Sequence, residues 1–243
     1  MGHTILNRFV LPMGVCSHVK LLLLLPAGMV LETELSSIER QKAAPQSFEI
    51  KARLLATQYS NSAFHGAALD RNHIGSELNR FLREVEAIHG ISKAEIATHG
   101  VYFSHETCTH ASSASSCAGN EVAALRFAFG NALLSKLLIL NTKGYTGHVS
   151  IELSRRFQST STSHNSHFFL EQPMGVSFED VTAVEVLLRQ RVPPIPNFSE
   201  KDEYLGDLNL SKGGAYACRY ALRFAAGFGS QVAFALYTTS QYD

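Results

Sequence analysis

The chain has 243 residues, of which 45% are hydrophobic, and its 21 basic and 21 acidic residues give a formal net charge of zero. This much apolar material is enough for the core of one large domain or two small ones. No basic block argues for a nucleic acid as partner, and no run reaches the ~18 continuous apolar residues of a membrane span. Four cysteines without a CxxC pair favour reduced thiols in a cytoplasmic protein.

The first 75 residues predict little regular structure. Lys20 precedes an apolar run over residues 21–25, which starts too late and follows too little positive charge for a secretory signal. We expect a buried element there instead. Residues 56–71 are rich in small and polar residues, as loops are. We therefore interpret residues 1–75 as a poorly defined N-terminal extension and expect the main domain at residues 76–243.

Helical and strand patterns become clear from Ser76 onward. Apolar residues at helical spacing predict a helix that Ser76 caps and Gly90 ends. Ser92 and Glu95 have the form of a capping box, which predicts a second helix immediately afterwards. Residues 101–103 then predict a short strand.

The alternation of helix and strand continues to the end of the chain. Asn120 can cap a helix, and the continuous apolar run of residues 137–140 predicts a buried strand. Ser177 opens another helix, whereas the Pro-rich residues 192–196 must be extended. Two strands are expected around residues 227–229. The sum predicts an α/β layered domain.

Two histidines each follow one of these predicted strands. His105 lies in residues 104–109, directly after the strand at 101–103, and His148 ends the segment 141–148. Neutral imidazoles presented in this way can donate hydrogen bonds to one developing oxyanion. Carbon–carbon bond formation between thioesters requires such donors. A structural role for either histidine is the alternative.

A zinc site is the less favoured interpretation of the first histidine segment. His105, Glu106 and His110 suggest the His-Glu-x-x-His motif of metalloproteases. That motif needs histidines four residues apart on one helical face, whereas here the gap is five and a strand precedes it. His164 and His167 lie in a segment of anomalous composition. We therefore predict no metal site.

Residues 149–172 differ in composition from the sequence on both sides. Without them His148 would join Pro173, and a compact Gly-His turn would lead straight into the next helix. A translated intron is the favoured interpretation, because Val149 and Ser150 can be encoded by GTAAGT and Gln172 by CAG. A long surface loop is the alternative, since loops absorb insertions at little cost.

From about residue 76 to its end, the chain resembles the β-ketoacyl synthases of fatty-acid and polyketide assembly. Residues 105–109 resemble the family's His-Gly-Thr-Gly-Thr motif, and residues 143–148 its Lys-Ser-Asn-apolar-Gly-His motif. Residues 193–198 resemble its Pro-rich segment, residues 208–214 a divergent branch of large synthases, and residues 227–230 its Gly-Phe-Gly-Gly turn. The resemblance implies a thiolase-like layered fold.

Five residues depart from these family motifs and indicate a diverged subfamily. Glu106 and Cys108 replace the glycines of the first motif. Gly144 and Tyr145 replace Ser and Asn in the second, and Ser230 replaces the last Gly of the turn.

A larger departure concerns the nucleophile. The family places a reactive Cys on a strand-to-helix elbow in its N-terminal half, and no segment upstream of residue 76 fits that description. Cys16 lies too near the start, and Cys117 follows His105, in the wrong order. Cys108 and Cys117 are expected to be small buried residues. The chain therefore looks like the C-terminal half of a ketosynthase.

The resemblance implies a decarboxylative Claisen condensation of an acyl thioester with a malonyl thioester. His105 and His148 would donate hydrogen bonds to the enolate oxygen, and Lys143 would anchor the site. The backbone N–H of Phe228 would complete the oxyanion hole, within a turn whose glycines permit close approach. Phe228 as a core residue is the alternative.

The resemblance also implies the partners of the chain. Thr107 and Thr109 would hydrogen-bond the phosphopantetheine arm of an acyl carrier protein, or else they are ordinary strand-end residues. No tightly bound cofactor is implied. A homodimer or a complementary N-terminal ketosynthase half is a further partner. A non-catalytic thiolase-like remnant, surviving as a partner subunit or a pseudogene product, is the alternative function.

Overall fold

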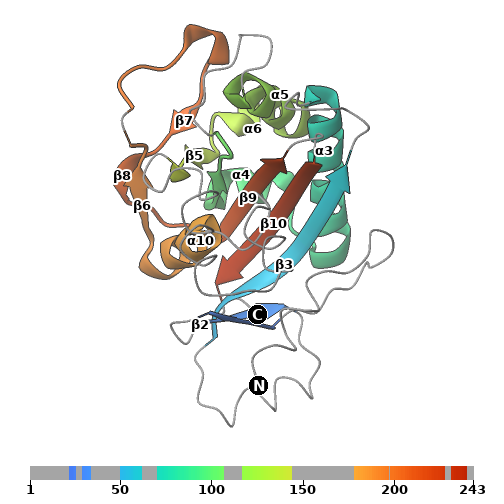
Figure 1. Cartoon of the computed structure of the whole chain (residues 1–243), viewed down its shortest axis with the longest axis vertical. Coiled ribbons are helices and arrows are strands. Elements are labelled where there is room, and N and C mark those ends of the chain that lie inside the picture. The colour runs from blue at the N-terminus through green and yellow to red at the C-terminus, as the bar shows by residue number, and fades with distance from the viewer. Residues whose placement is uncertain are drawn as a thin grey trace, which may run out of the picture.

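The structure, a computed structural model, describes most of the chain outside the N-terminal segment and the region around residues 144–177 (Figure 1). The described residues are 22–25, 29–33, 50–61, 70–106, 117–143, 178–196, 198–227 and 231–239. The helices are α3 (Arg71–His89), α4 (Lys93–His99), α5 (Cys117–Phe129), α6 (Asn131–Leu134), α10 (Phe178–Arg189) and the 3-10 turn η2 (Glu203–Leu205).

The described strands form an eight-stranded mixed sheet and a separate two-stranded ribbon. In spatial order the large sheet contains β1 (Leu22–Leu25), β2 (Met29–Thr33), β3 (Ile50–Asn61), β10 (Gln231–Thr239), β9 (Tyr220–Gly227), β4 (Gly100–Phe103), β5 (Leu138–Leu140) and β7 (Asn209–Leu210). The ribbon pairs β6 (Arg191–Pro194) with β8 (Lys212–Ala215). The predicted α/β layered fold is confirmed.

Strand directions bring several loops to one edge of the sheet. β4 is parallel to β5 and to β9, and β5 is parallel to β7. β10 is antiparallel to both β9 and β3, so β3 runs in the same direction as β9 and β4. The carboxyl ends of β3, β9, β4 and β5 therefore share one edge, which is where α/β sheets bind ligands.

Both faces of the sheet are covered by apolar side chains. On one face a large buried cluster joins α3, α4, α5 and α6 to alternate residues of the central strands, such as Leu222 and Phe234. On the other face α10 contributes Ala183, Val184 and Leu187 to a second cluster with Phe103. All four residues of β4 are buried, as expected for a central strand with parallel neighbours.

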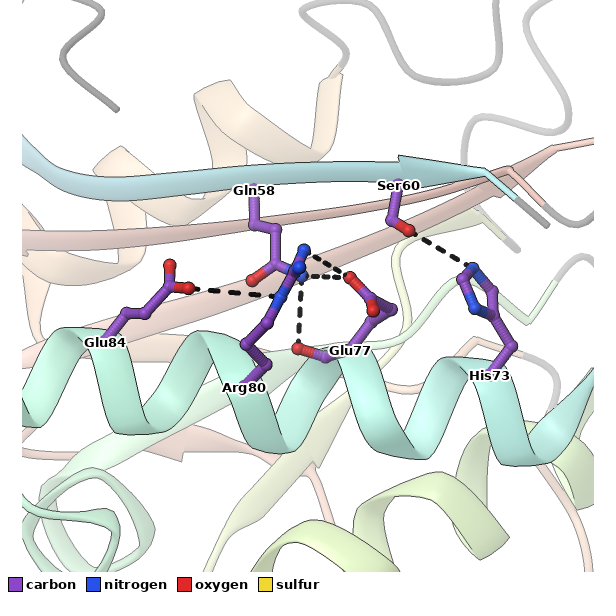
Figure 2. Close-up of polar contacts among 6 residues, drawn as sticks. All are labelled: Gln58, Ser60, His73, Glu77, Arg80 and Glu84. Atoms are coloured by element: carbon purple, nitrogen blue, oxygen red, sulfur yellow. Dashed lines mark hydrogen bonds and ion pairs between the residues drawn. The ribbon is translucent and has the colours of Figure 1, made fainter. Parts of the chain in front are cut away.

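Strand β3 contacts α3 through polar side chains (Figure 2), next to Leu55 and Ala56, which pack against the apolar cluster that includes α3. Gln58 donates a hydrogen bond of 2.5 Å to Glu77, and Ser60 lies 3.3 Å from the imidazole of His73. Arg80 adds an ion pair of 2.6 Å to Glu77. The predicted loop at residues 56–71 is therefore wrong for residues 56–61. These residues form the end of β3 and pair with β10.

Two predicted helix starts are also wrong. α3 begins at Arg71 rather than at Ser76, because the Asp70 carboxylate accepts hydrogen bonds from the first-turn backbone. α5 begins at Cys117 rather than after Asn120. Two other predicted helix boundaries are confirmed: Gly90, in the left-handed conformation, ends α3, and Ser92 is the N-cap of α4. Whether an autonomous domain begins at residue 76 stays a prediction.

Replacing the caps by alanine distinguishes the two helix starts. Asp70→Ala removes the side-chain acceptor of the N–H groups of Asn72 and His73, so it should lower the free energy of unfolding by about 1 kcal/mol. Ser76→Ala is the matched control and should be neutral or slightly stabilising, since alanine favours a helix interior. Urea unfolding measures both, and a larger loss in Ser76→Ala would contradict the observed start.

Candidate active site

His105 and Lys143 follow neighbouring parallel strands at the carboxyl edge of the sheet. Past the end of β4, the backbone N–H of Ser104 still donates a hydrogen bond of 2.9 Å to the carbonyl of Leu140 on β5. His105 is the next residue after Ser104, and Lys143 lies three positions after Leu140. The strand ladder therefore brings the first histidine segment and the predicted lysine to adjacent places.

A buried glutamate of α5 holds the segment around His105. The Oε1 atom of Glu121 accepts a hydrogen bond of 2.9 Å from the backbone N–H of His105 and one of 2.7 Å from the hydroxyl of Tyr102. Its Oε2 atom accepts a bond of 3.0 Å from the hydroxyl of Ser104. Three donors from the end of β4 thus converge on one carboxylate that is 4% exposed.

The protonation of Glu121 reflects a competition between burial and these donors. Burial raises the pKa of Glu121 from 4.5 to about 7, although the hydrogen bonds from Tyr102, the His105 backbone and Ser104 act in the opposite direction. Burial and the nearby Glu121 carboxylate also raise the pKa of Tyr102 well above 10. Desolvation is therefore the larger effect, and Glu121 changes charge near neutral pH.

The imidazole of His105 is enclosed by the protein. His105 is 5% exposed, and its ring stands edge-on to Phe224 of β9, with centroids 6.0 Å apart and planes at 75°. Backbone fixation by Glu121 and ring contact with Phe224 leave the side chain little freedom. A preorganised donor is the form in which a histidine contributes most to charge stabilisation.

Lys143 is held by a carboxylate on the opposite face of the sheet. Its Nζ atom lies 3.3 Å from Oε1 of Glu179, in the first turn of α10, and the two side chains are 9% and 7% exposed. Removing one partner of such a buried pair leaves an uncompensated charge and costs about 3–5 kcal/mol. The pair therefore fixes the position of the ammonium group and ties β5 to α10.

A second buried ion pair anchors the same turn of α10. Asp180 lies 3.2 Å from Nε of Arg223 on β9 and accepts a hydrogen bond of 2.7 Å from the hydroxyl of Tyr237 on β10. All three residues are buried. Burial and the Asp180 charge raise the pKa of Tyr237 well above 10. Glu179 and Asp180 together thus hold α10 to the end of β5, to β9 and to β10.

Four of the six predicted site residues lie outside the described part of the chain. These are Thr107, Thr109, His148 and Phe228. Of the predicted set, the structure therefore describes His105 and Lys143, each just beyond the end of one of two neighbouring strands. β9 ends at Gly227 on the same edge of the sheet.

Cys218 is the cysteine whose thiol surroundings the structure describes. It is buried against α10, and burial raises the pKa of its thiol to about 11. It also precedes β9, whose first residue Tyr220 pairs with Gly100 at the start of β4. Cys218 thus lies at the edge of the sheet opposite His105, protonated and unsuited to nucleophilic attack.

Neither a metal cluster nor a membrane span is found in the described residues. No group of three or more His, Cys, Asp or Glu side chains there is placed to hold a metal ion. No helix within the described ranges is long and apolar enough to cross a bilayer.

Sequence analysis missed two residues of this site. Glu121 is the acidic residue of the apolar helix α5, and it lies on the same face as the buried Leu125 and Ala128. A carboxylate on the apolar face of a helix is a signal that could have been used. Glu179 could not be recognised in this way, because acidic residues are common in the first turn of any helix.

Comparison with solved structures identifies the fold. A complex of a type II polyketide-synthase acyl-carrier protein with its ketosynthase matches at a TM-score of 0.58 and 20% identity, over 83% of this chain and 41% of that one. A β-ketoacyl synthase from Burkholderia phymatum matches at 0.59 and 15% identity, over 83% and 40%. The ishigamide ketosynthase/chain length factor matches at 0.57 and 18% identity, over 84% and 41%.

The chain has a ketosynthase fold. It spans about two fifths of the length of the ketosynthases it matches, so it corresponds to one part of that fold. No protein-family model matches the chain, and no curated protein matches its sequence.

The pH dependence of stability tests the burial of Glu121. The folded protein keeps the proton of this carboxyl to about pH 7, whereas the unfolded chain releases it near 4.5. The contribution of Glu121 is therefore fully present below pH 4.5 and is lost as the pH rises through 7, a decrease of about 3 kcal/mol.

Glu121→Gln removes this titration and keeps the shape of the side chain. Its amide oxygen can accept from Tyr102 and the His105 backbone, and its amide can donate to Ser104. The free energy of unfolding of the variant, minus that of the wild type, should increase by about 3 kcal/mol between pH 4.5 and 8. Urea titrations at each pH measure this difference, and a constant difference would show that Glu121 is not buried as described.

The contact between Lys143 and Glu179 bears on the segment between them. Their side chains meet at 3.3 Å, so the ends of the intervening chain are already close together. We expect a variant lacking residues 149–172 to fold, with a loop-closure cost lower by about 1 kcal/mol because the loop becomes about threefold shorter. Circular dichroism and urea unfolding check this outcome. Loss of cooperative unfolding would show that the segment is an integral part of the fold.

The intron interpretation has its own test. Continuous transcript reads across residues 149–172 would exclude an intron.

Proposed function

We propose that the chain is the C-terminal half of a β-ketoacyl-carrier-protein synthase, which condenses an acyl thioester with a malonyl thioester in fatty-acid or polyketide biosynthesis. The observation that carries this proposal is that His105 and Lys143 follow neighbouring parallel strands at the carboxyl edge of a ketosynthase fold. Each is fixed by a buried carboxylate, Glu121 or Glu179.

The proposed chemistry begins with loss of carbon dioxide from the malonyl thioester. The thioester oxygen gains negative charge as the enolate forms. N–H donors on His105 and His148 would stabilise that charge, with one preorganised donor worth about 3–4 kcal/mol. The enolate carbon then attacks the carbonyl carbon of an acyl thioester, and the tetrahedral oxyanion would accept a hydrogen bond from the backbone N–H of Phe228. Collapse of this intermediate breaks the acyl C–S bond and releases the thiolate that carried the acyl group.

The remaining proposed roles concern position and recognition. Lys143, paired with Glu179, would anchor the second histidine segment. Thr107 and Thr109 would hydrogen-bond the phosphopantetheine arm of an acyl carrier protein, the kind of partner seen in one of the structural neighbours. Reduced thiols and thioester substrates together favour the cytoplasm as the place of action.

The acyl-accepting cysteine would come from outside this chain. Cys218 is buried with a raised thiol pKa. Cys16 lies too near the start, Cys117 follows His105 in the wrong order for the family, and Cys108 is expected to be a small buried residue. A complementary chain carrying the N-terminal half would supply the nucleophile. The second candidate is a non-catalytic remnant, and the missing nucleophile is the observation in its favour.

Decarboxylation without condensation tests the histidine site separately from the nucleophile. The full chain, incubated with malonyl thioester on a carrier protein, should release carbon dioxide above the blank. His105→Ala should reduce the rate by about 10²–10³-fold, because it removes a transition-state donor. His99→Ala is the matched control, since His99 is exposed and precedes β4 where His105 follows it, and its rate should equal the wild-type rate.

Acyl transfer tests the nucleophile. Mass spectrometry after incubation with an acyl thioester should show no adduct on the chain alone. Addition of a ketosynthase N-terminal half bearing the cysteine should restore condensation. An acyl adduct on any of the four cysteines would contradict both the remnant and the need for a second chain. Absence of carbon dioxide release with and without the second half would leave the remnant as the function.

A further inference from the structure

One side chain just outside the two histidine motifs joins the segments that follow β4 and β5. Asn141 is 7% exposed, and its Nδ2 atom donates a hydrogen bond of 2.6 Å to the backbone carbonyl of Glu106. Glu106 is the neighbour of His105, and Asn141 lies two positions before Lys143. A single amide therefore connects the backbone beside the histidine to the backbone beside the lysine.

The backbone around His105 is fixed from more than one direction. Its N–H donates to Glu121 of α5, and the N–H of Glu106 donates to the hydroxyl of Ser104 at 3.0 Å. Both contacts hold the segment to α5 and to its own strand. The bond from Asn141 comes instead from the residue after β5, so it links the two strand ends directly beyond the last ladder bond.

Lys143 is held on its other side. Its ion pair with Glu179 fixes the ammonium group relative to α10. A change in the position of residues 104–106 would therefore move His105 relative to Lys143, because Lys143 would not follow. Misplacement of a reacting group by about 1 Å can reduce a rate about 100-fold.

We propose that Asn141 is a positioning residue, which holds the imidazole of His105 at its working distance from Lys143. This inference rests on the proposed function for its effect on rate. Its effect on the surroundings of His105 follows from the hydrogen bond alone and can be measured in the absence of activity.

A hydrogen bond at the amino end of β5 offers a matched control. Asn209 on β7 also donates through Nδ2 to a backbone carbonyl, that of Lys136, at 3.1 Å. Lys136 precedes β5, whereas Asn141 follows it. Asn209→Ala and Asn141→Ala each remove one amide-to-carbonyl bond across neighbouring strands, but the first does so away from His105.

The experiment compares Asn141→Ala, Asn141→Asp and Asn209→Ala in the full chain. The ¹H–¹⁵N signals of the His105 imidazole, assigned from their loss in His105→Gln, report its surroundings. Urea unfolding reports stability, and decarboxylation of a malonyl thioester gives kcat and KM. Both alanine variants should lower the urea midpoint. Asn141→Ala alone should shift the His105 signals and reduce kcat by about tenfold or more, with KM within about twofold.

Asn141→Asp gives a reversible version of the same change. Its protonated carboxyl can donate a hydrogen bond to the Glu106 carbonyl, whereas its carboxylate cannot. The His105 signals of this variant should therefore match the wild type at low pH and depart from it at high pH. A role limited to stability would not produce this pH dependence.

The outcomes separate the inference from the proposed function. If the wild type releases no carbon dioxide, the proposed function fails, and the His105 signals still decide the role of Asn141. His105 signals that are unchanged in Asn141→Ala, or shifted equally in Asn209→Ala, would overturn the inference. If Asn141→Ala does not fold, Asn141→Asp supplies the comparison, and wild-type signals over its whole pH range would overturn the inference as well.

Discussion

One buried carboxylate determines the geometry at the end of β4. Glu121 accepts hydrogen bonds from Tyr102, Ser104 and the backbone of His105, so helix α5, the strand end and the histidine form one unit. Burying a carboxylate is unfavourable unless donors surround it. The raised pKa of Glu121 shows that three donors compensate for desolvation only in part. The contact is therefore a means of fixing position rather than a source of stability.

The pair of Lys143 and Glu179 acts in the same manner on the other face of the sheet. A buried ion pair contributes little net stability compared with well-packed apolar residues, although breaking it is costly. The neighbouring pair of Asp180 and Arg223 doubles this constraint on α10. As a result the first turn of α10 is tied to the strands by contacts that do not involve residues 144–177. The position of Lys143 thus depends on the ion pair with Glu179 and on the contacts of Asp180 that hold α10.

The sequence predicts those structural features that depend on residues close together in the chain. Residues 101–103 and 137–140 were recognised as strands because they are continuously apolar, and Ser92 as a cap because its partner is three residues away. Strand β3 was missed, because its face toward α3 carries Gln58 and Ser60 and its partner β10 lies far along the chain. Glu179 was missed because its role exists only through a tertiary contact with Lys143.

The composition of the site bears on the choice between an enzyme half and a remnant. The described sheet is covered on both faces by its own helices, so its core does not depend on Glu121, Lys143 or Glu179. Apolar residues of similar volume in place of both Lys143 and Glu179 would often be neutral or stabilising for the fold. An apolar residue in place of Glu121 would instead leave three buried donors without their acceptor. A remnant would bear the desolvation of Lys143 and Glu179 without benefit. The buried pair of Lys143 and Glu179 is therefore the observation that favours the proposed ketosynthase half over the remnant.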